Sequence, residues 1–111
     1  MIPPLRDQVA AAIKDGLARA SKDLGWPDVD GVPVEVERPA NPEHGDYASN
    51  VALRLARQAR KPPREIAKAI RDRVRVAPPI AAVEDLSGFV NVRLDERWLA
   101  SQVDEIVRAG R

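Results

Sequence analysis

Three side chains of different chemistry alternate near the end of the chain: Phe89, Asn91 and Arg93. Because successive residues of a β-strand point to opposite faces, these three would share one face. The β-branched and aliphatic residues between them suit a core: Val90, Val92 and Leu94. A ring can stack on a nucleobase, an amide can read a base edge, and a guanidinium can hold a phosphate. The strand is therefore either a nucleic-acid contact surface or an ordinary edge strand with a mixed outer face.

A second group of candidate residues is basic and recurs at helical spacing. Residues 54–75 carry nine basic and two acidic residues, a net charge of +7, in a chain whose total is +1. Four of these cations follow at intervals of four, three and four, which gives one stripe on a helix: Arg64, Lys68, Arg71 and Arg75. Such a stripe can meet successive phosphates of a nucleic acid. A solvated helix face is the alternative interpretation.

The third candidate group lies in a turn-rich segment, residues 38–47, which contains two prolines and one glycine. His44 and Asp46 could form an acid–base pair or ligate a metal, but one imidazole without a second His or Cys is a poor metal site. No nucleophile is an obvious partner for the imidazole. A structural loop is favoured, in which Gly45 permits the turn and Asp46 caps the next helix. Tyr47 would pack beneath this loop or begin a short extra strand. We therefore predict no catalytic residue, no metal and no cofactor.

The elements that position these residues follow from hydrophobic periodicity. Helical spacing of apolar residues predicts a first helix from Leu5 to Leu24, with a stop at Gly25. Alternation predicts a strand over residues 32–38, and Pro33, which has no N–H, indicates an edge strand or the beginning of the strand. A second helix is expected over residues 47–60. A third is expected from the Pro62–Pro63 pair to the prolines at 78 and 79, with Ile66, Ile70 and Val74 inward.

The C-terminal part of the chain predicts a β-hairpin followed by a helix. Residues 80–85 and 89–94 read as two antiparallel strands joined by a short turn at residues 86–88. Asp95 would cap a last helix over residues 96–108, with Trp98 packed at its edge. The order of elements predicts an α+β fold with two layers. A small antiparallel sheet of three to four strands would be covered on one face by about four helices.

Composition limits the class of protein further. The 111 residues suit a single domain, residues 1–111, and the absence of cysteine excludes disulfides and thiolate metal sites. No apolar run reaches membrane length and the first residues do not form a signal peptide. We therefore expect a cytoplasmic location and no membrane partner.

Three motifs together resemble the N-terminal additional domain of arginyl-tRNA synthetases, and they span about the whole chain. They are His44–Leu53 (HGDYASNVAL), Lys61–Ala67 (KPPREIA) and Gly88–Leu94 (GFVNVRL). The resemblance implies a domain that leans on the outer corner of an arginine-accepting tRNA and contacts its D-loop. It further implies that Phe89 stacks on a D-loop base, that Asn91 hydrogen-bonds the edge of the base, and that Arg93 and the basic stripe contact the tRNA backbone.

The motifs of the catalytic domain of that family, a His-x-Gly-His signature and a Lys-Met-Ser-Lys loop, do not occur in the sequence. We therefore expect no ligase activity from this chain alone. It would be either the N-terminal part of an arginine–tRNA ligase, with a catalytic domain in cis, or a free-standing relative. The alternative is a protein-interaction or general RNA-binding module that keeps the fold without a synthetase.

Overall fold

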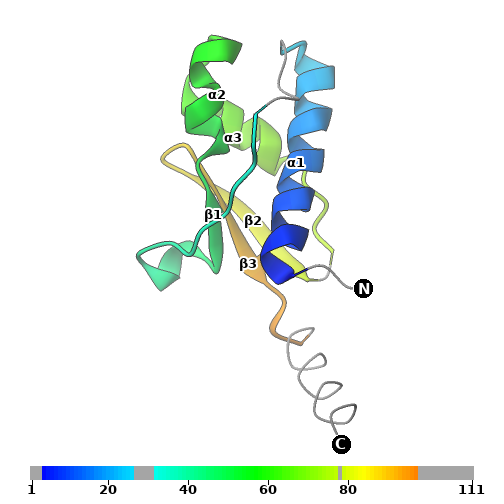
Figure 1. The fold of residues 1–111 in the computed structure, drawn as a ribbon, viewed down its shortest axis with the longest axis vertical. Helices are drawn as coiled ribbons and strands as arrows, with labels where there is room; N and C mark the ends of the chain where they lie inside the picture. Colours follow the sequence, from blue (N-terminus) through cyan, green and yellow to red (C-terminus); the bar gives the residue numbers. More distant parts are fainter. Residues whose placement is uncertain (1–3, 27–31, 78, 98–111) are drawn as a thin grey trace, which may run out of the picture.

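A computed structural model describes residues 4–26, 32–77 and 79–97 of the chain. Its elements are, in order, α1 (Leu5–Leu24), the 3₁₀ helix η1 (Pro42–His44), β1 (Tyr47–Ser49), α2 (Val51–Ala59), α3 (Pro63–Arg71), β2 (Ile80–Leu86) and β3 (Phe89–Leu94). The strands form one antiparallel sheet in the order β1-β3-β2. The three α-helices lie together over one face of the sheet (Figure 1).

This arrangement confirms the predicted two-layer α+β fold, with three α-helices in the described part of the chain rather than about four. The predicted last helix falls mainly outside the described residues, as does Trp98. Its expected cap is present, since Asp95 Oδ1 accepts a hydrogen bond of 2.9 Å from the backbone N–H of Arg97. No helix in the described part of the chain has the length and apolar character of a membrane span.

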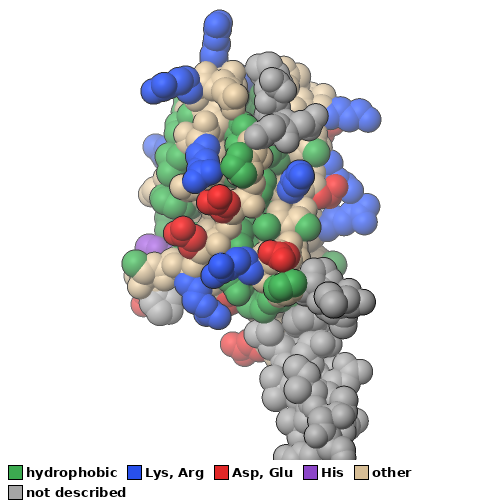
Figure 2. All heavy atoms as spheres, viewed as in Figure 1, with side chains coloured by type: hydrophobic (Ala, Val, Ile, Leu, Met, Phe, Trp, Pro, Cys, Tyr) green, Lys and Arg blue, Asp and Glu red, His purple; other side chains and the backbone are tan. Residues whose placement is uncertain are grey.

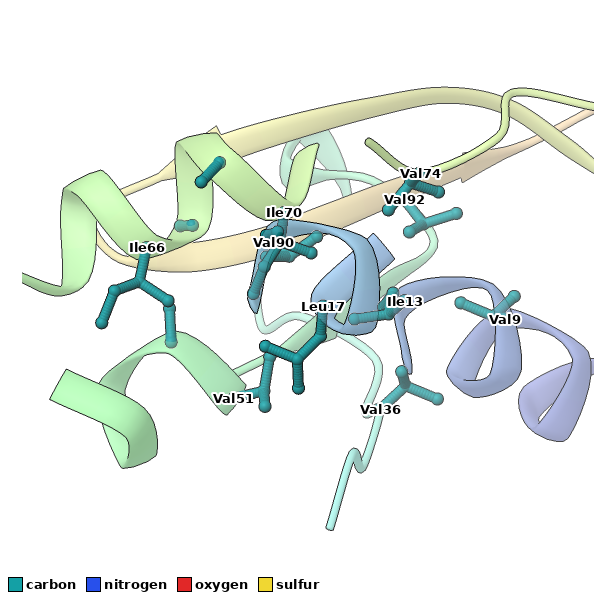
Figure 3. Packing of buried hydrophobic residues seen from close by; sticks show 14 of the residues in the cluster. Val9, Ile13, Leu17, Val36, Val51, Ile66, Ile70, Val74, Val90 and Val92 are labelled. Atoms are coloured by element: carbon teal, nitrogen blue, oxygen red, sulfur yellow. The ribbon is translucent and has the colours of Figure 1, made fainter. Parts of the chain in front are cut away.

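Helix α1 has the predicted bounds and ends at Gly25 in the left-handed conformation, with φ +70°. Its buried side includes Val9, Ile13 and Leu17, which pack between the other helices and the sheet (Figure 3). Leu24, the last apolar residue of the helical pattern, is 49% exposed and lies outside the core. The turn at Gly25 brings Trp26 into the core instead.

The largest correction concerns the residues before α2. The predicted helix start at Tyr47 was wrong and the alternative, a short extra strand that begins there, is confirmed, because Tyr47–Ser49 form strand β1 and pair with Val90–Val92 of β3. The helix begins at Val51. Asp46 does not cap it. Asp46 Oδ2 accepts a 2.8 Å hydrogen bond from the backbone N–H of Leu94, which fixes the loop to β3.

The strand predicted over residues 32–38 was also wrong as a regular element. Only Glu37 pairs with β1, through an isolated antiparallel bridge to Ala48. Two features limit the pairing. Pro33 has no backbone N–H to donate, and β1 offers an edge only three residues long. Val36 is nevertheless buried, so this segment closes one side of the core.

The β2–β3 hairpin confirms the prediction for the C-terminal strands. Its turn residues Ser87 and Gly88 have φ +51° and +85°, as in the two-residue turns that match strand twist. Val90, Val92 and Leu94 are buried, as their alternation predicted, and Figure 3 shows Val90 and Val92 facing the helices. The opposite face of β3 therefore carries Phe89, Asn91 and Arg93.

Candidate nucleic-acid interface

The sheet face opposite the helices contains a pocket of about 370 Å³, here called the sheet pocket. Ala48 and Asn91 line it from adjacent strands, where they are directly paired. The hairpin contributes Phe89, and α2 contributes Arg54. The remaining lining comes mainly from residues 35–40 and from the loop that follows. The pocket thus combines strand, helix and loop, and two of the three alternating residues of β3 line it.

Phe89 is the exposed aromatic group of this pocket. Its side chain is 39% exposed although Phe is among the residues that proteins usually bury. Its cross-strand neighbour Leu86 is 42% exposed and lines the same pocket. The ring is therefore open to a planar apolar ligand, and the core contacts of β3 do not depend on it.

Asn91 has the predicted face but not the predicted exposure, since it is only 5% exposed. Its Nδ2 donates a hydrogen bond of 2.7 Å to the carbonyl oxygen of His44. Its Oδ1 is buried and has no hydrogen-bond partner among the described residues. Leaving a buried acceptor unpaired costs roughly 1–3 kcal/mol. A ligand that donates a hydrogen bond to Oδ1 would recover that free energy.

Arg93 also holds the loop, because its Nη2 donates a hydrogen bond to the carbonyl oxygen of Glu43. Its Nε lies 3.9 Å from Glu84 Oε1 on β2. Together with the contacts of Asn91 and Asp46, this hydrogen bond attaches the segment around η1 to the outer side of β3. One N–H of the guanidinium is thus engaged with the protein.

The loop conformation depends on Gly45, which has φ +112°. A Cβ atom at this position would lie 2.9 Å from the carbonyl oxygen of Val92, so another residue would push the loop off β3. His44 lines the sheet pocket, and its backbone carbonyl oxygen accepts the hydrogen bond from Asn91 Nδ2. In the described part of the chain, no three His, Cys, Asp or Glu side chains are grouped as metal ligands.

The basic stripe is shorter than its spacing suggested. Helix α3 ends at Arg71, so Arg75 lies beyond the helix that would align it with Arg64 and Lys68. Arg71 makes ion pairs of 2.9 Å with Asp72 and 3.1 Å with Asp85. By contrast, Arg64, Lys68 and Arg75 have no ion pair within the described ranges. None of the four lines the sheet pocket.

Several pocket residues were not among the sequence candidates, chiefly Glu35, Glu37 and Arg54. Arg54 Nη2 lies 3.4 Å from Glu35 Oε2, and the pair joins α2 to the segment before the loop. The alternation over residues 32–38 carried a signal for the two acids, since they lie opposite the inward valines. The pairing between Glu35 and Arg54 had no sequence signal.

Comparison with known protein families and sequences gives a consistent result. The family described as "Arginyl tRNA synthetase N terminal domain" matches residues 7–94. An arginine–tRNA ligase of Anaeromyxobacter dehalogenans is 43% identical over 100 residues, which cover 86% of this chain and 17% of the ligase. One from Geobacillus kaustophilus is 38% identical over 109 residues, which cover 94% of this chain and 19% of the ligase. The chain thus spans less than a fifth of the length of these relatives.

Two solved structures share the fold. Arginyl-tRNA synthetase of Thermus thermophilus superposes with a TM-score of 0.69 and 30% identity, over 89% of this chain and 15% of the synthetase. The Plasmodium falciparum arginyl-tRNA synthetase gives a TM-score of 0.76 at 13% identity, over 92% of this chain and 18% of that protein. The second likeness concerns the fold alone.

Proposed function

The chain belongs to the arginyl-tRNA synthetase N-terminal domain family, and on this basis we propose that it binds tRNA at the D-loop, on the outer corner of the molecule. We further propose that it acts within an arginine–tRNA ligase, as its curated relatives are named. In this role the chain contributes RNA binding and no catalytic group. Ligase chemistry would reside in the part of those relatives that the chain does not match.

The observation that carries the proposal is the pairing of Phe89 with Asn91 in one pocket. The exposed ring offers a stacking surface for one base. The unpartnered Oδ1 of Asn91 is buried, and it becomes an acceptor for the edge of that base when the residues that cover it move aside. Because Nδ2 already donates to His44, the base edge must present a hydrogen-bond donor, such as an amino or imino N–H.

Charge supports an RNA ligand as well. We propose that the unpaired cations Arg64, Lys68 and Arg75 contact phosphates. Arg71 is less suited to this role, because it is neutralised by two carboxylates. Arg93 can meet a phosphate through N–H groups other than the one bonded to Glu43, because its side chain is 44% exposed. We therefore expect it to act on RNA binding both by direct contact and by holding the loop.

The proposal is tested by Phe89→Ala. The matched control is Leu24→Ala, which removes an exposed apolar side chain that does not line the sheet pocket. Affinity for an arginine-accepting tRNA transcript is measured for both variants, with thermal melting as a check of folding. Loss of a base–aromatic stack predicts that Phe89→Ala weakens binding by about 1–3 kcal/mol, or roughly 5- to 150-fold. The control should bind like the wild type.

The same measurement with transcripts that carry one abasic D-loop position identifies the stacked base. Phe89→Ala should cost nothing further on the transcript that lacks this base, because the two changes remove one contact. If Phe89→Ala binds every transcript as tightly as the wild type, the sheet pocket is not the RNA site. A sharp fall in melting temperature with unchanged affinity would instead make Phe89 a structural residue.

A further inference from the structure

A second surface, here called the hairpin hollow, lies at the tip of the β2–β3 hairpin. It has a volume of about 670 Å³ and is lined by Leu53, Pro63, Arg64, Asp85, Leu86 and Ser87. Leu53 and Leu86 are each 42% exposed, so two large aliphatic side chains face solvent here. Both would gain from contact with an apolar ligand surface.

The turn that borders the hairpin hollow is packed against the helices. A Cβ atom on Gly88 would lie 3.0 Å from the Pro63 side chain and 3.2 Å from that of Leu53, so the turn packs directly on the starts of α2 and α3. Figure 1 shows the hairpin tip beside these helices.

The hairpin hollow is continuous with the sheet pocket. Leu86 and Ser87 line both. Leu86 is also the direct cross-strand partner of Phe89. An RNA strand with one base stacked on Phe89 would therefore place the neighbouring nucleotide near Leu86.

The charges around the hollow favour a polyanion. Five cations on α2, α3 and their connection have no ion pair in the part of the chain that the structure describes: Arg57, Arg60, Lys61, Arg64 and Lys68. In Figure 2, Lys and Arg side chains project at the end of the molecule formed by α2. The one carboxylate of the hollow, Asp85, is paired with Arg71 at 3.1 Å. Apolar platforms bordered by unpaired cations are typical of single-stranded nucleic-acid sites.

From these observations we propose that the hairpin hollow binds a second nucleotide of the same RNA strand, adjacent to the one on Phe89. Its base packs on Leu53 and Leu86, and Arg64 holds its phosphate. The inference rests on the proposed function and extends it from one base to two consecutive nucleotides. Mutations can test the two sites separately, because Phe89 belongs to the first and Leu53 and Arg64 belong to the second.

The test uses Leu53→Ser and Arg64→Gln, with Leu24→Ser and Lys14→Gln as controls of matched type outside the hollow. Binding is measured to an arginine-accepting tRNA transcript and to versions with single abasic positions across the D-loop. Leu53→Ser should weaken binding roughly threefold to tenfold, from lost apolar contact. This loss should vanish on a transcript that is abasic at a position next to the one coupled to Phe89.

Each outcome bears on one of the two sites. If Phe89→Ala weakens binding but Leu53→Ser and Arg64→Gln match their controls, the second nucleotide site is refuted and the first stands. If Phe89→Ala has no effect, the proposed function itself fails. Arg64→Gln alters an exposed side chain and decides the matter if Leu53→Ser fails to fold. A polyglutamate peptide that binds the wild type but neither variant, while RNA binding is unchanged, would assign the hollow to an acidic protein.

Discussion

Replacing Asn91 by Asp tests the central feature of the sheet pocket, the side-chain amide of Asn91. Its Nδ2 donates to the His44 carbonyl, and its Oδ1 has no hydrogen-bond partner among the described residues. Asn91→Ala removes the 2.7 Å bond to His44 and leaves that carbonyl without its partner. It also removes the orphaned Oδ1. These effects oppose each other, so we expect a net loss of about 1 kcal/mol in the free energy of unfolding.

Asn91→Asp keeps the shape of the side chain but replaces the donor with a second acceptor. At neutral pH a carboxylate would face the His44 carbonyl at a position that is only 5% exposed. The described contacts of Asn91 include no cation that could compensate it. A buried charge without a partner costs about 3–5 kcal/mol. Asn91→Asp should therefore destabilise the chain by at least 2 kcal/mol more than Asn91→Ala.

The difference between the two variants depends on pH. Burial beside a carbonyl raises the pKa of the introduced carboxyl in the folded state, because only the protonated form can donate a hydrogen bond to His44. A carboxyl whose pKa is raised by folding contributes stability that is fully present below its pKa in the unfolded chain, which is about 4. This contribution is lost as the pH rises through the pKa of the same carboxyl in the folded chain. The excess cost of Asn91→Asp should therefore shrink when the pH is lowered to about 4.

Urea denaturation of the wild type and both variants at pH 7 and pH 4 provides the measurement. The reasoning would be refuted if Asn91→Asp were as stable as Asn91→Ala at pH 7, or if its excess cost did not fall at low pH. Either result would mean that Asn91 is hydrated and does not hold the loop. Its amide would then be free to present both donor and acceptor to a base.

Two other predictions concern the helices. Gly16→Ala should lower the free energy of unfolding by about 1–2 kcal/mol, although Ala has the better helix propensity. The reason is that its Cβ would lie 2.6 Å from Val74 Cγ2 and 3.1 Å from the Ile70 carbonyl oxygen. In urea denaturation, a stability at or above that of the wild type would show that α1 can move away from α3. Lys68→Gln should reduce the slope of log affinity against log salt for tRNA by about 1, and a slope equal to that of the Lys14→Gln control would assign Lys68 to solvated surface.

The sequence predicted best the features that depend on one element or on neighbouring elements. Helical periodicity gave α1 its bounds, and alternation gave β3 its buried and outer faces. The hairpin followed from two strand-like runs joined by a turn predicted at residues 86–88, of which Ser87 and Gly88 form the turn in the structure. These patterns are local, so no knowledge of distant partners was needed.

What the sequence could not predict depends on contacts between distant segments. Tyr47 and Val51 have helical spacing, so the sequence left a helix start and a short extra strand both open at Tyr47, and only its pairing with Val92 decides for the strand. The face of Asn91 was predictable, but its burial was not, because η1 covers it from 47 positions away in the chain. Likewise, the partner of Arg71 on β2, Asp85, had no signal in the spacing of the basic residues.

The two polar residues of β3 differ in what a ligand would require of them. Asn91 Oδ1 is buried, so a base donor can reach it only if the residues that cover it move, although Nδ2 can stay bonded to His44. A phosphate can meet Arg93 without breaking its bond to the Glu43 carbonyl, because the side chain is 44% exposed and the guanidinium has five N–H donors. The bonds of Asn91 and Arg93 hold the loop on β3, and a loop that is already ordered lowers the entropic cost of binding. On this argument the loop positions the base site, and both Arg93 and the unpaired cations of the helices can contact phosphates.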